Sequence, residues 1–563
     1  MKELFRLLSL RRSLTFELSV ATLFINILVF ADTLYVMIVL RRYIAHGFDG
    51  TLLLLTLGVL AAVFMQFILR EARTVIAGMV GKGHDRKTSD PVFTVFSKAD
   101  FQALEQLPKD QSQQIAGALQ DVHAAYEAPN INAVMDAPFS LVFVAAAYVL
   151  SPILALIVLV GMAGSLLTGL LSEKQTREPI KHLQQVSSEN RGLVGSTLFS
   201  ADTVRVFLGG AFYKKLWKDQ TRKLAAVRRK LADTKGLTQS LSGTISVFVR
   251  VAVYAVGAKL VVNGDLTFAA LIGASILASY AVQGTTSFVR AKSLLLKADE
   301  GSVRIQKFLS LPLEPEHGET PRESSGELVF QELSFSFPGA DKPLFSSLNV
   351  TLKPGSALIV QGYNGSGKTT LARMVAGLLK PTEGKILIHG TDLREMDSGW
   401  WRGQIIYMPQ EPFFLAGTIR ENLTMANPGL DAASLNRIIR AVGLRRFLDT
   451  SEKGLETMLA RNGRDLSLGI RRRLALARAL ATDGNLAVLD EPTEGLDPEG
   501  AQAVYAVMND LAKRGKTIIA FTHDRNIVKG ANFILDLSEK PAPRLTLVRE
   551  PTPKADSPEG GGA

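Results

Sequence analysis

The chain has 563 residues, which is too long for a single ordinary domain. Apolar residues make up 47% of it, 21% are charged and the mean hydropathy is +0.16, a mixture that predicts a membrane portion joined to a soluble portion. There are no cysteines, so disulfides and cysteine-ligated metals are excluded. The net charge of +11 would suit nucleic acid or an anionic membrane surface, but basic loops beside membrane helices explain it more simply. We therefore expect a lipid bilayer and no nucleic acid as partner.

Six apolar stretches occupy the first half of the chain. Several approach the ~20 residues that an α-helix needs to span a bilayer. Because six such runs cluster on one side of the chain, they favour membrane helices over the buried helices of a large soluble protein. The third and fourth are separated only by Ser151, which predicts a tight hairpin. The stretches are Leu18–Leu40, Thr51–Leu69, Ala137–Leu150, Pro152–Leu171, Leu241–Val262 and Phe268–Val282.

The connections between these stretches alternate between short and long. The two long ones, Arg70–Asp136 and Ser172–Ser240, carry helical patterns, so the membrane helices should continue well into the cytoplasm. The second of them is rich in Lys and Arg, and such loops stay cytoplasmic. With an even number of spans, the N-terminus and the C-terminal half should both be cytoplasmic. Arg250, inside the fifth stretch, is costly in lipid and should face the interior or a partner.

The sequence changes character after the last apolar stretch. Leu311–Ser325 is rich in Pro, Glu and Ser, as in a linker, and from Glu327 short β-like runs alternate with helices. That alternation predicts an α/β domain with a largely parallel sheet. The predicted division is a six-helix membrane domain over 1–310, a linker over 311–326, an α/β domain over 327–545 and a disordered tail over 546–563.

The segment "GYNGSGKT" is a P-loop, because it follows an apolar strand and opens a helix. Its glycines let backbone N–H groups turn toward phosphate oxygens, and the helix N-terminus favours negative charge. Lys368 would reach the β- and γ-phosphates of ATP, and Thr369 would ligate Mg²⁺. The predicted ATP-binding residues are Gly362, Tyr363, Asn364, Gly365, Ser366, Gly367, Lys368, Thr369 and Thr370.

An acidic pair supplies the second half of the predicted site. In "NLAVLDEP" a short apolar strand ends in Asp490, which suits that residue to hold Mg²⁺ through water. Glu491 follows, where it could polarise an attacking water molecule. An acidic pair that merely ends a strand is the alternative, and the P-loop upstream argues against it.

With both motifs in place, residues 327–537 resemble the nucleotide-binding domain of an ATP-binding cassette (ABC) transporter. The resemblance implies that Phe337 stacks on adenine and that Gln410 contacts Mg²⁺ or the attacking water. It further implies that His523 contacts the γ-phosphate and that Asp497 is the D-loop aspartate. ATP and Mg²⁺ are the implied cofactors, with Glu491, His523 and Gln410 as the implied catalytic residues.

The segment "LSLGI" resembles the family's signature motif, Leu-Ser-Gly-Gly-Gln, with two letters changed. In this family two domains sandwich two ATP molecules, and the motif reaches the γ-phosphate that the other domain binds. Ser467 and Gly469 keep the family's letters, whereas Leu468 replaces the first glycine and Ile470 the glutamine. Leu468 adds bulk and removes the freedom that glycine has at positive φ. We therefore expect a weakened trans-acting clamp rather than a lost one.

Six spans placed ahead of the ATPase domain resemble an ABC exporter. Within the exporters, the Asp136-Ala137-Pro138 turn with the Ser151-Pro152 hairpin, and the segment Val256–Ser279, resemble the bacterial type I secretion ATPase/permeases. The arginine–proline pair that often follows the second segment in that family is replaced here by "SYAVQG". The resemblance implies a multi-pass protein of the bacterial inner membrane. It also implies that the segments Ala99–Leu107 and Phe207–Trp217 couple to the ATPase domain.

One chain carries one membrane domain and one ATPase domain, so two half-transporter chains must pair. We expect two identical chains, with a mixed pair as the alternative. The expected cargo is a protein or peptide, handed to a periplasmic membrane fusion protein and an outer-membrane channel. Export of a lipid, drug or small thiol compound stays open. So does a regulatory half of a heterodimer, which Leu468 and Ile470 favour and Glu491 and His523 oppose.

Overall fold

A computed structural model describes residues 2–44, 47, 49–108, 111–315, 318–321 and 327–550 of the chain. The chain divides into two compact units. The first consists of Met1–Ser97 and Leu107–Leu311, and the second of Lys98–Gln106 and Pro312–Ala563. The second unit therefore takes in the predicted linker and also a short segment, 98–106, that the sequence placed in the membrane domain.

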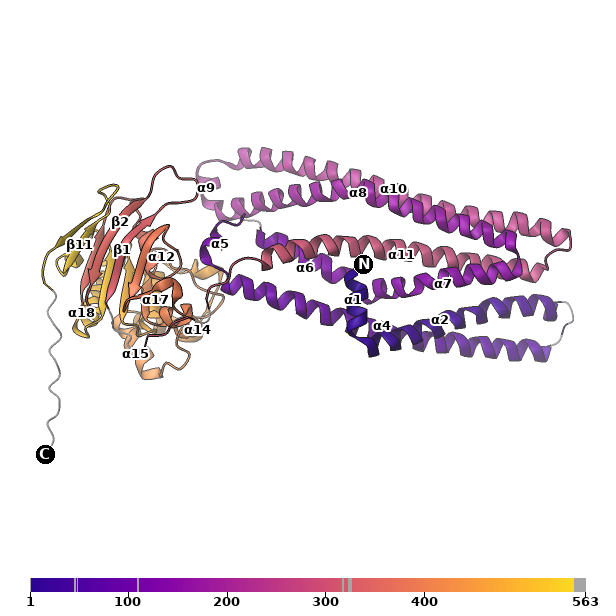
Figure 1. The fold of residues 1–563 in the computed structure, drawn as a ribbon, viewed down its shortest axis with the longest axis horizontal. Helices are drawn as coiled ribbons and strands as arrows, with labels where there is room; N and C mark the ends of the chain where they lie inside the picture. The colour runs from indigo at the N-terminus through magenta and orange to yellow at the C-terminus, as the bar shows by residue number, and fades with distance from the viewer. Residues whose placement is uncertain are drawn as a thin grey trace, which may run out of the picture. The chain divides into compact units, whose positions relative to one another are not determined.

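The described part of the first unit is helical (Figure 1). A π-helical turn, Val39–Tyr43, extends the second helix. The helices are α1 (Lys2–Leu10), α2 (Arg12–Ile38), α4 (Asp49–Lys98), α6 (Gln111–Ala125), α7 (Ala128–Leu150), α8 (Pro152–Phe199), α9 (Ala201–Val206), α10 (Gly210–Val262) and α11 (Phe268–Leu309).

Six of these helices are long and apolar enough to cross a membrane, and each contains one predicted stretch. The six-span prediction is thereby confirmed. Helix α10 has 53 residues, and at about 1.5 Å per residue it measures about 80 Å, far more than the ~30 Å of a bilayer's hydrocarbon core. The helices thus extend well beyond the membrane. The predicted hairpin is also present, because only Ser151 separates α7 from α8.

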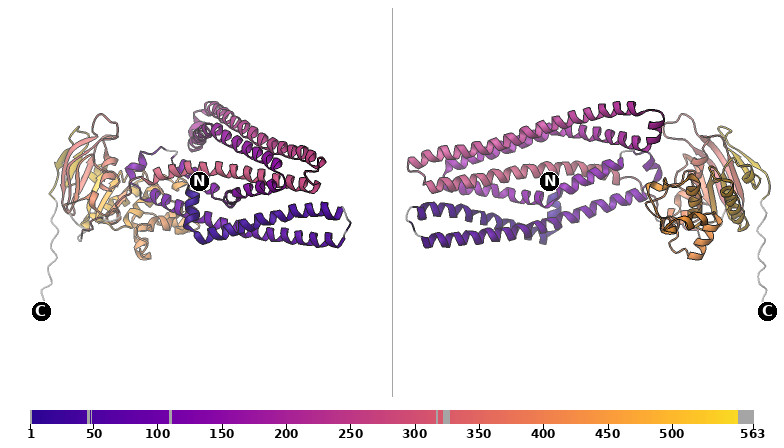
Figure 2. Two further views of the ribbon diagram at one scale, coloured as in Figure 1. Left: turned by 45° about the vertical axis from the view of Figure 1, so that its right-hand side comes forward. Right: turned by 180° about the vertical axis from the view of Figure 1, so that it is seen from behind.

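The core of this unit lies among α2, α7, α8, α10 and α11. Helices α8 and α10 run side by side along much of their length (Figures 1 and 2). Small residues permit such contacts between helices. At Gly257 of α10, for example, an added Cβ would overlap the side chain of Leu271 in α11.

The second unit contains two main sheets. A six-stranded sheet has the order β12-β11-β3-β10-β9-β6 and is parallel except for β12. A four-stranded antiparallel sheet has the order β2-β1-β4-β5. The strands are β1 (Leu328–Phe335), β2 (Phe345–Leu352), β3 (Ala357–Gln361), β4 (Glu383–Ile388), β5 (Thr391–Asp392), β6 (Ile405–Met408), β7 (Gly417–Thr418), β8 (Met458–Leu459), β9 (Leu486–Asp490), β10 (Thr517–Phe521), β11 (Phe533–Asp536) and β12 (Arg544–Leu547).

Helices connect and flank these strands (Figure 1). Short 3₁₀ turns cover Leu393–Glu395, Gly454–Glu456 and Arg461–Gly463. The α-helices are α5 (Phe101–Glu105), α12 (Lys368–Val375), α13 (Ser398–Gly403), α14 (Ile419–Thr424), α15 (Ala432–Ala441), α16 (Arg445–Thr450), α17 (Leu468–Leu480), α18 (Pro498–Lys513) and α19 (Arg525–Val528).

The sheets differ from the prediction in two ways. The sequence predicted one largely parallel sheet, but β1 and β4 pair with each other in the separate antiparallel sheet. The predicted start of the disordered tail at 546 is wrong, because β12 pairs antiparallel with β11 through Leu547 and Val548 N–H donates to the carbonyl of Asn532 at 2.8 Å. The remainder of the predicted tail, 551–563, lies outside the described residues.

Candidate active site

The P-loop joins the end of β3 to the start of α12. Its bend depends on glycine: an added Cβ at Gly362 would lie 2.5 Å from Ser366 Oγ, and Gly367 precedes α12 with φ +110°. A helix whose first N–H groups have no partner within the helix attracts anions. Lys368 is the first residue of α12, so its ammonium lies beside that anion-attracting end.

The buried residue Lys368 is the centre of a cluster of catalytic candidates. Its Nζ lies 2.8 Å from the carbonyl oxygen of Gly362 and 3.1 Å from Glu491 Oε1. His523 Nε2 lies 3.0 Å from the same Nζ and 2.7 Å from the Gly362 carbonyl. A neutral imidazole nitrogen either donates or accepts, so one tautomer can make only one of these two bonds. Lys368 of the P-loop, Glu491 and His523 thus lie close together.

Oxygen donors form a second group beside this cluster. The hydroxyl of Thr369 lies 2.7 Å from Asp490 Oδ2 and 3.3 Å from Gln410 Oε1. Asp490 Oδ1 is buried with no hydrogen-bond partner in the described structure. Mg²⁺ prefers such uncharged and carboxylate oxygens, usually with phosphate and water completing its shell. Thr369, Gln410 and Asp490 therefore fit a magnesium ion.

Burial controls the protonation of Asp490. Its side chain is almost fully enclosed, and burial raises its pKa to about 6, with the charge of Glu491 adding to the rise. The hydrogen bond from Thr369 and the nearby positive charge of Lys368 oppose this shift. A cation bound at Oδ1 would compensate the carboxylate charge, which the surrounding protein does only in part.

Glu491 has a strained backbone. Its φ is +45°, in the left-handed region that a non-glycine residue rarely adopts, and its N–H donates to the Phe521 carbonyl at 2.8 Å. Strain of this kind costs about 1–3 kcal/mol and persists where the surrounding structure enforces it, often at functional sites. Here it turns the carboxylate at the end of β9 toward Lys368.

The remaining predicted residues lie outside this cluster. Phe337 follows β1 with half of its ring exposed, and Phe335 packs edge-on to it at 5.1 Å. Ser467 caps α17 by accepting a hydrogen bond from Ile470 N–H at 3.3 Å. Asp497 caps α18 through Gly500 N–H at 2.9 Å. No contact in the described part of the chain joins Ser467 or Asp497 to the P-loop.

Two family models match the chain. The ABC transporter model covers residues 345–494, and the ABC transporter transmembrane region model covers residues 17–285. The chain belongs to the ABC transporter family. Together with the P-loop cluster, this membership makes it an ATP-hydrolysing transporter with a helical membrane domain and a nucleotide-binding domain.

The similarity to curated relatives extends over almost the whole chain. It is 24% identical over 525 residues to the alpha-hemolysin translocation ATP-binding protein HlyB of Escherichia coli, covering 93% of this chain and 74% of that one. It is 22% identical over 525 residues to the toxin RTX-I translocation ATP-binding protein of Actinobacillus pleuropneumoniae, with the same two coverages of 93% and 74%.

The fold has a solved counterpart. The structure of a bacterial Atm1-family ABC exporter with ATP bound is similar with a TM-score of 0.81 at 16% identity, covering 94% of each chain. This similarity shows that the chain has the fold of an ABC exporter.

Two arginines were not predicted from the sequence. They connect α17, the helix of the signature motif, to the acidic segment that follows β9. Arg472 is 4% exposed and donates to the Glu491 carbonyl at 2.8 Å and to Glu494 at 2.9 Å. Arg473 pairs with Asp497 at 2.6 Å. The Gly500 N–H, followed by Arg473, holds the pKa of Asp497 below its usual range. The sequence signal was the run of three arginines, 471–473, near the start of a helix that is mostly apolar.

A support behind the P-loop was also missed. Lys540, after β11, donates to the carbonyl of Ser366 at 2.9 Å and to that of Leu344. Ser538 Oγ accepts from Tyr363 N–H at 3.3 Å. The segment after the last parallel strand therefore holds the P-loop at one backbone carbonyl and at one backbone N–H. Nothing in the spacing of the sequence indicated this contact.

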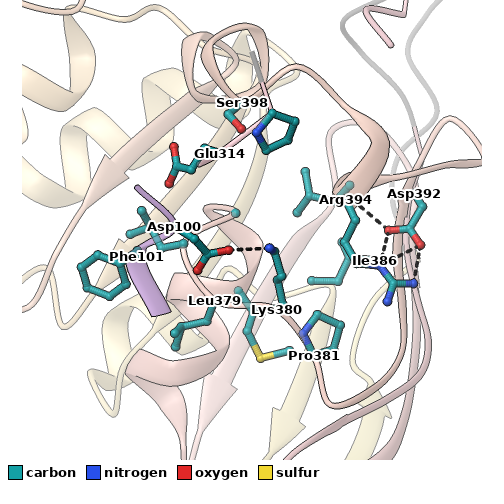
Figure 3. Close-up of a pocket in the computed structure, with 15 residues that line it drawn as sticks. Asp100, Phe101, Glu314, Leu379, Lys380, Pro381, Ile386, Asp392, Arg394 and Ser398 are labelled. Carbon is teal, nitrogen blue, oxygen red and sulfur yellow. Dashed lines mark hydrogen bonds and ion pairs between the residues drawn. The ribbon is translucent and has the colours of Figure 1, made fainter. Parts of the chain in front are cut away.

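The segment 98–106, most of the predicted coupling segment, lies on the nucleotide-binding domain. Asp100 caps α5 and forms an ion pair with Lys380, beside a cavity of about 240 Å³ that Leu379 and Pro381 also line (Figure 3). Arg373 of α12 pairs with Glu105 at 3.0 Å, and its guanidinium lies 5.6 Å from the Phe101 ring centre. Helix α5 therefore contacts the same helix that carries Lys368.

Proposed function

We propose that this chain is one half of a dimeric exporter that uses ATP hydrolysis to move a protein or peptide out across the bacterial inner membrane. The observation that carries the proposal is the convergence of Lys368, Asp490 and Glu491 behind a P-loop, in a chain that also has six candidate membrane helices. The names of the relatives, which translocate hemolysin and RTX toxin, favour a polypeptide cargo and a type I secretion system. The periplasmic fusion protein and outer-membrane channel belong to the same proposal.

Each residue of the cluster has a distinct task in this proposal. The P-loop N–H groups and Lys368 bind the phosphates, and Phe337 offers its exposed ring to adenine. Thr369, Asp490 and Gln410 hold Mg²⁺, which supplies positive charge to the phosphate oxygens. Glu491 orients the attacking water, and His523 donates a hydrogen bond to the γ-phosphate. Because Lys368 can pair with either Glu491 or phosphate, nucleotide entry would release the Glu491 carboxylate for water.

The second chain completes the site in this proposal. Ser467 begins α17, whose N-terminal dipole favours an anion, and Leu468 beside it is 41% exposed. An exposed helix start with no phosphate of its own suits a phosphate bound by a partner chain. In this proposal the nucleotide-binding domain and the N-terminus are cytoplasmic, which the many Lys and Arg residues of α10 support.

The ATPase activity of the full chain in lipid nanodiscs tests the catalytic part. Glu491→Gln should lower the activity by about 10²–10⁴-fold while ATP still binds, because the water loses its base. Glu499→Gln is the matched control, since Glu499 is an exposed acid in the first turn of α18. A measurable wild-type activity that Glu491→Gln keeps in full would rule out the assigned base.

The absence of native cysteines makes dimerisation directly testable. Asn364→Cys in the P-loop and Ser467→Cys at the start of α17 should form an intermolecular disulfide when ATP is added to the Glu491→Gln chain. Each single-cysteine chain is the control. No ATP-dependent cross-link in a chain that binds ATP would reject the identical pair.

A mixed pair is the second candidate, and Leu468 is the observation that favours it. A half-transporter whose partner carries the intact motif would keep one strong site and one weak site. The purified chain would then show no ATPase activity above Glu491→Gln, and activity would appear on adding the partner. Uptake of a labelled peptide, lipid or drug into inverted vesicles separates the possible cargoes.

A further inference from the structure

Two open cavities in the helical unit share a lining residue. The first has a volume of about 360 Å³ and lies among α2, α4, α7 and α11. The second, of about 300 Å³, lies between α10 and α11. Gln283 of α11 lines both, and its amide makes no hydrogen bond in the described structure. The cavities therefore adjoin at a side chain that offers both a donor and an acceptor.

The charges around these cavities do not balance. Arg70 and Arg73 line the first cavity and Arg250 the second, whereas Asp136 is the one acidic residue among all the described lining residues. Asp136 is already engaged, since Arg73 lies 2.6 Å from its Oδ1 and Asn26 donates to the same atom at 3.1 Å. Arg70 and Arg250 form no ion pair within the described parts of the chain. Among the described residues, neither arginine has a carboxylate within ion-pairing distance, and Asp32, whose charge reaches Tyr280 in the lining of the first cavity, is the one further acid that acts on that lining.

The position of Arg250 makes this imbalance costly. It lies twelve residues before the end of α10 at Val262, or about 18 Å along the helix. That depth falls within the ~30 Å hydrocarbon core of a bilayer. Ionisable residues in a membrane span are expensive and usually pair with another group or line a substrate path. An anion in the adjoining cavities would supply the missing counter-charge.

Two buried polar atoms beside the first cavity also lack partners. They are Nε of Arg73, a residue that is 7% exposed, and Oγ of Ser140, a residue that is 2% exposed. Gly284 of α11 lets Ser140 approach, because an added Cβ there would overlap the hydroxyl. A buried donor left without a hydrogen-bond partner is destabilising. Both atoms can donate, so they add hydrogen-bond capacity for a group rich in acceptor oxygens.

We propose that the adjoining cavities bind carboxylates of the transported polypeptide, so that the exporter prefers acidic, Asp- or Glu-containing segments. This inference rests on the proposed export of a protein or peptide and names the chemistry of its cargo. Arg70 and Arg250 bind the carboxylates, and Gln283 and Asn26 are placed for the peptide groups between them. Cavities of a few hundred cubic ångströms accept short stretches of extended chain rather than a folded domain.

Peptide binding to the full chain in nanodiscs of neutral phosphatidylcholine tests this proposal. The probe is a fluorescein-labelled extended peptide with several aspartates, compared with the same peptide carrying asparagines, both without nucleotide. The aspartate peptide should bind at least about tenfold more tightly, the effect of one hydrogen bond between charged groups. Equal binding of the two peptides overturns the proposal.

Variants assign the binding to the arginines. Arg70→Gln and Arg250→Gln should each weaken binding of the aspartate peptide by about tenfold, and Arg250→Lys should restore most of it. Arg229→Gln is the matched control, because Arg229 lies on α10 but lines neither cavity. Asp136→Asn should tighten binding, since it frees Arg73 from its counter-ion. This gain cannot arise from misfolding, so unchanged or weaker binding in Asp136→Asn counts against the proposal.

Anionic lipid is the other source of such a group. If phosphatidylglycerol added to the nanodiscs displaces the aspartate peptide and itself protects the arginines, the cavities bind a lipid phosphate and the proposal fails. The proposed ATP-driven export is tested separately, because peptide binding needs no hydrolysis. A chain with normal Glu491-dependent ATPase activity but no charge-selective binding would reject only the cargo assignment.

Discussion

Leu468 packs over Gly495. A Cβ built on Gly495 would lie 2.8 Å from Cδ2 of Leu468, and Gly495 has a φ of +68°. Leu468 opens α17, while Gly495 lies two residues before Asp497 in the turn that leads to α18. The bulk that replaces the first glycine of the signature motif is thus accommodated by a glycine in the D-loop turn. The altered signature motif therefore packs against the rest of the nucleotide-binding domain.

Restoring the family's residues at positions 468 and 470 should strengthen the contact of the signature motif with the partner's γ-phosphate. In Leu468→Gly with Ile470→Gln, the helix start can approach the partner's γ-phosphate more closely and offer a further N–H group. One hydrogen bond to a charged group is worth about 1.5 kcal/mol, so the ATPase rate at saturating ATP should rise by about tenfold. Steady-state phosphate release measures it. An unchanged rate would mean that the two replaced letters do not limit turnover.

Gly495→Ala should destabilise the domain through both its backbone and its contact with Leu468. A non-glycine residue in the left-handed region costs about 1–2 kcal/mol, and the methyl group would also press on Leu468. Gly390→Ala is the matched control, because Gly390 has a φ of +80° and open space around its Cβ. Urea unfolding should show a larger loss at Gly495. Leu468→Ala should recover the difference, and failure to do so would contradict the contact.

Asp490 should make the nucleotide-free protein less stable as pH rises. Its folded pKa of about 6 exceeds the usual 3.8, so the folded state keeps a proton that the unfolded state has released between these values. Stability therefore falls as pH rises through that window, by up to about 3 kcal/mol at pH 7. Asp490→Asn should raise the thermal midpoint in EDTA at pH 7 and leave it nearly unchanged near pH 4.

A carboxylate with the opposite shift provides the control for that experiment. The pKa of Asp497 is lowered by the Gly500 N–H and by Arg473, so its contribution is present above about pH 4 and lost as pH falls through its folded pKa. Asp497→Asn should therefore lower the midpoint at pH 7. A midpoint that moves in the same direction in both variants would contradict the assigned cause.

Lys540 should matter for ATP affinity because its ammonium holds the P-loop at Ser366, although Lys540 is not itself a predicted ATP ligand. Lys540→Met removes the donor that holds the Ser366 carbonyl, and a looser P-loop should raise the KM for ATP by about three- to tenfold, the loss of one hydrogen bond. The kcat should change less. Exposed Lys529→Met is the control. A fall in kcat with unchanged KM would place Lys540 in the chemistry rather than in P-loop support.

Periodicity predicted the parts of the fold that depend on local sequence. Apolar stretches of membrane length predicted six helices, and Ser151 with Pro152 predicted the hairpin, because length and helix-starting residues are local properties. The separation of β1 and β4 into their own sheet was missed, since strand partners are chosen by packing between distant segments. The strand β12 was missed because it has only four residues and all of them are exposed, so its short polar–apolar alternation marks no buried face.

The predictability of the site follows the same division. Motif residues such as Lys368, Asp490 and Glu491 were identified because their chemistry demands particular residue types at particular spacings. Arg472 and Lys540 were not, because each acts on a backbone carbonyl, Glu491 or Ser366, that any residue could provide. The left-handed backbone of Glu491 was equally invisible in the sequence.

Helix α12 is only eight residues long, and both of its ends are occupied. Lys368 begins it at the P-loop, and Arg373, five residues later, holds Glu105 and Phe101 of α5. Five residues of helix measure about 7.5 Å. The part of α12 that lies between the P-loop and the α5 contacts is therefore short and can bend little. A small tilt forced on α12 by the nucleotide would reach α5 undiminished, and α5 is continuous in the chain with the long membrane helix α4 through Lys98–Asp100. The P-loop and α5 are thus joined through the side chains of one short helix, which makes Arg373 a direct route by which nucleotide binding can act on α5.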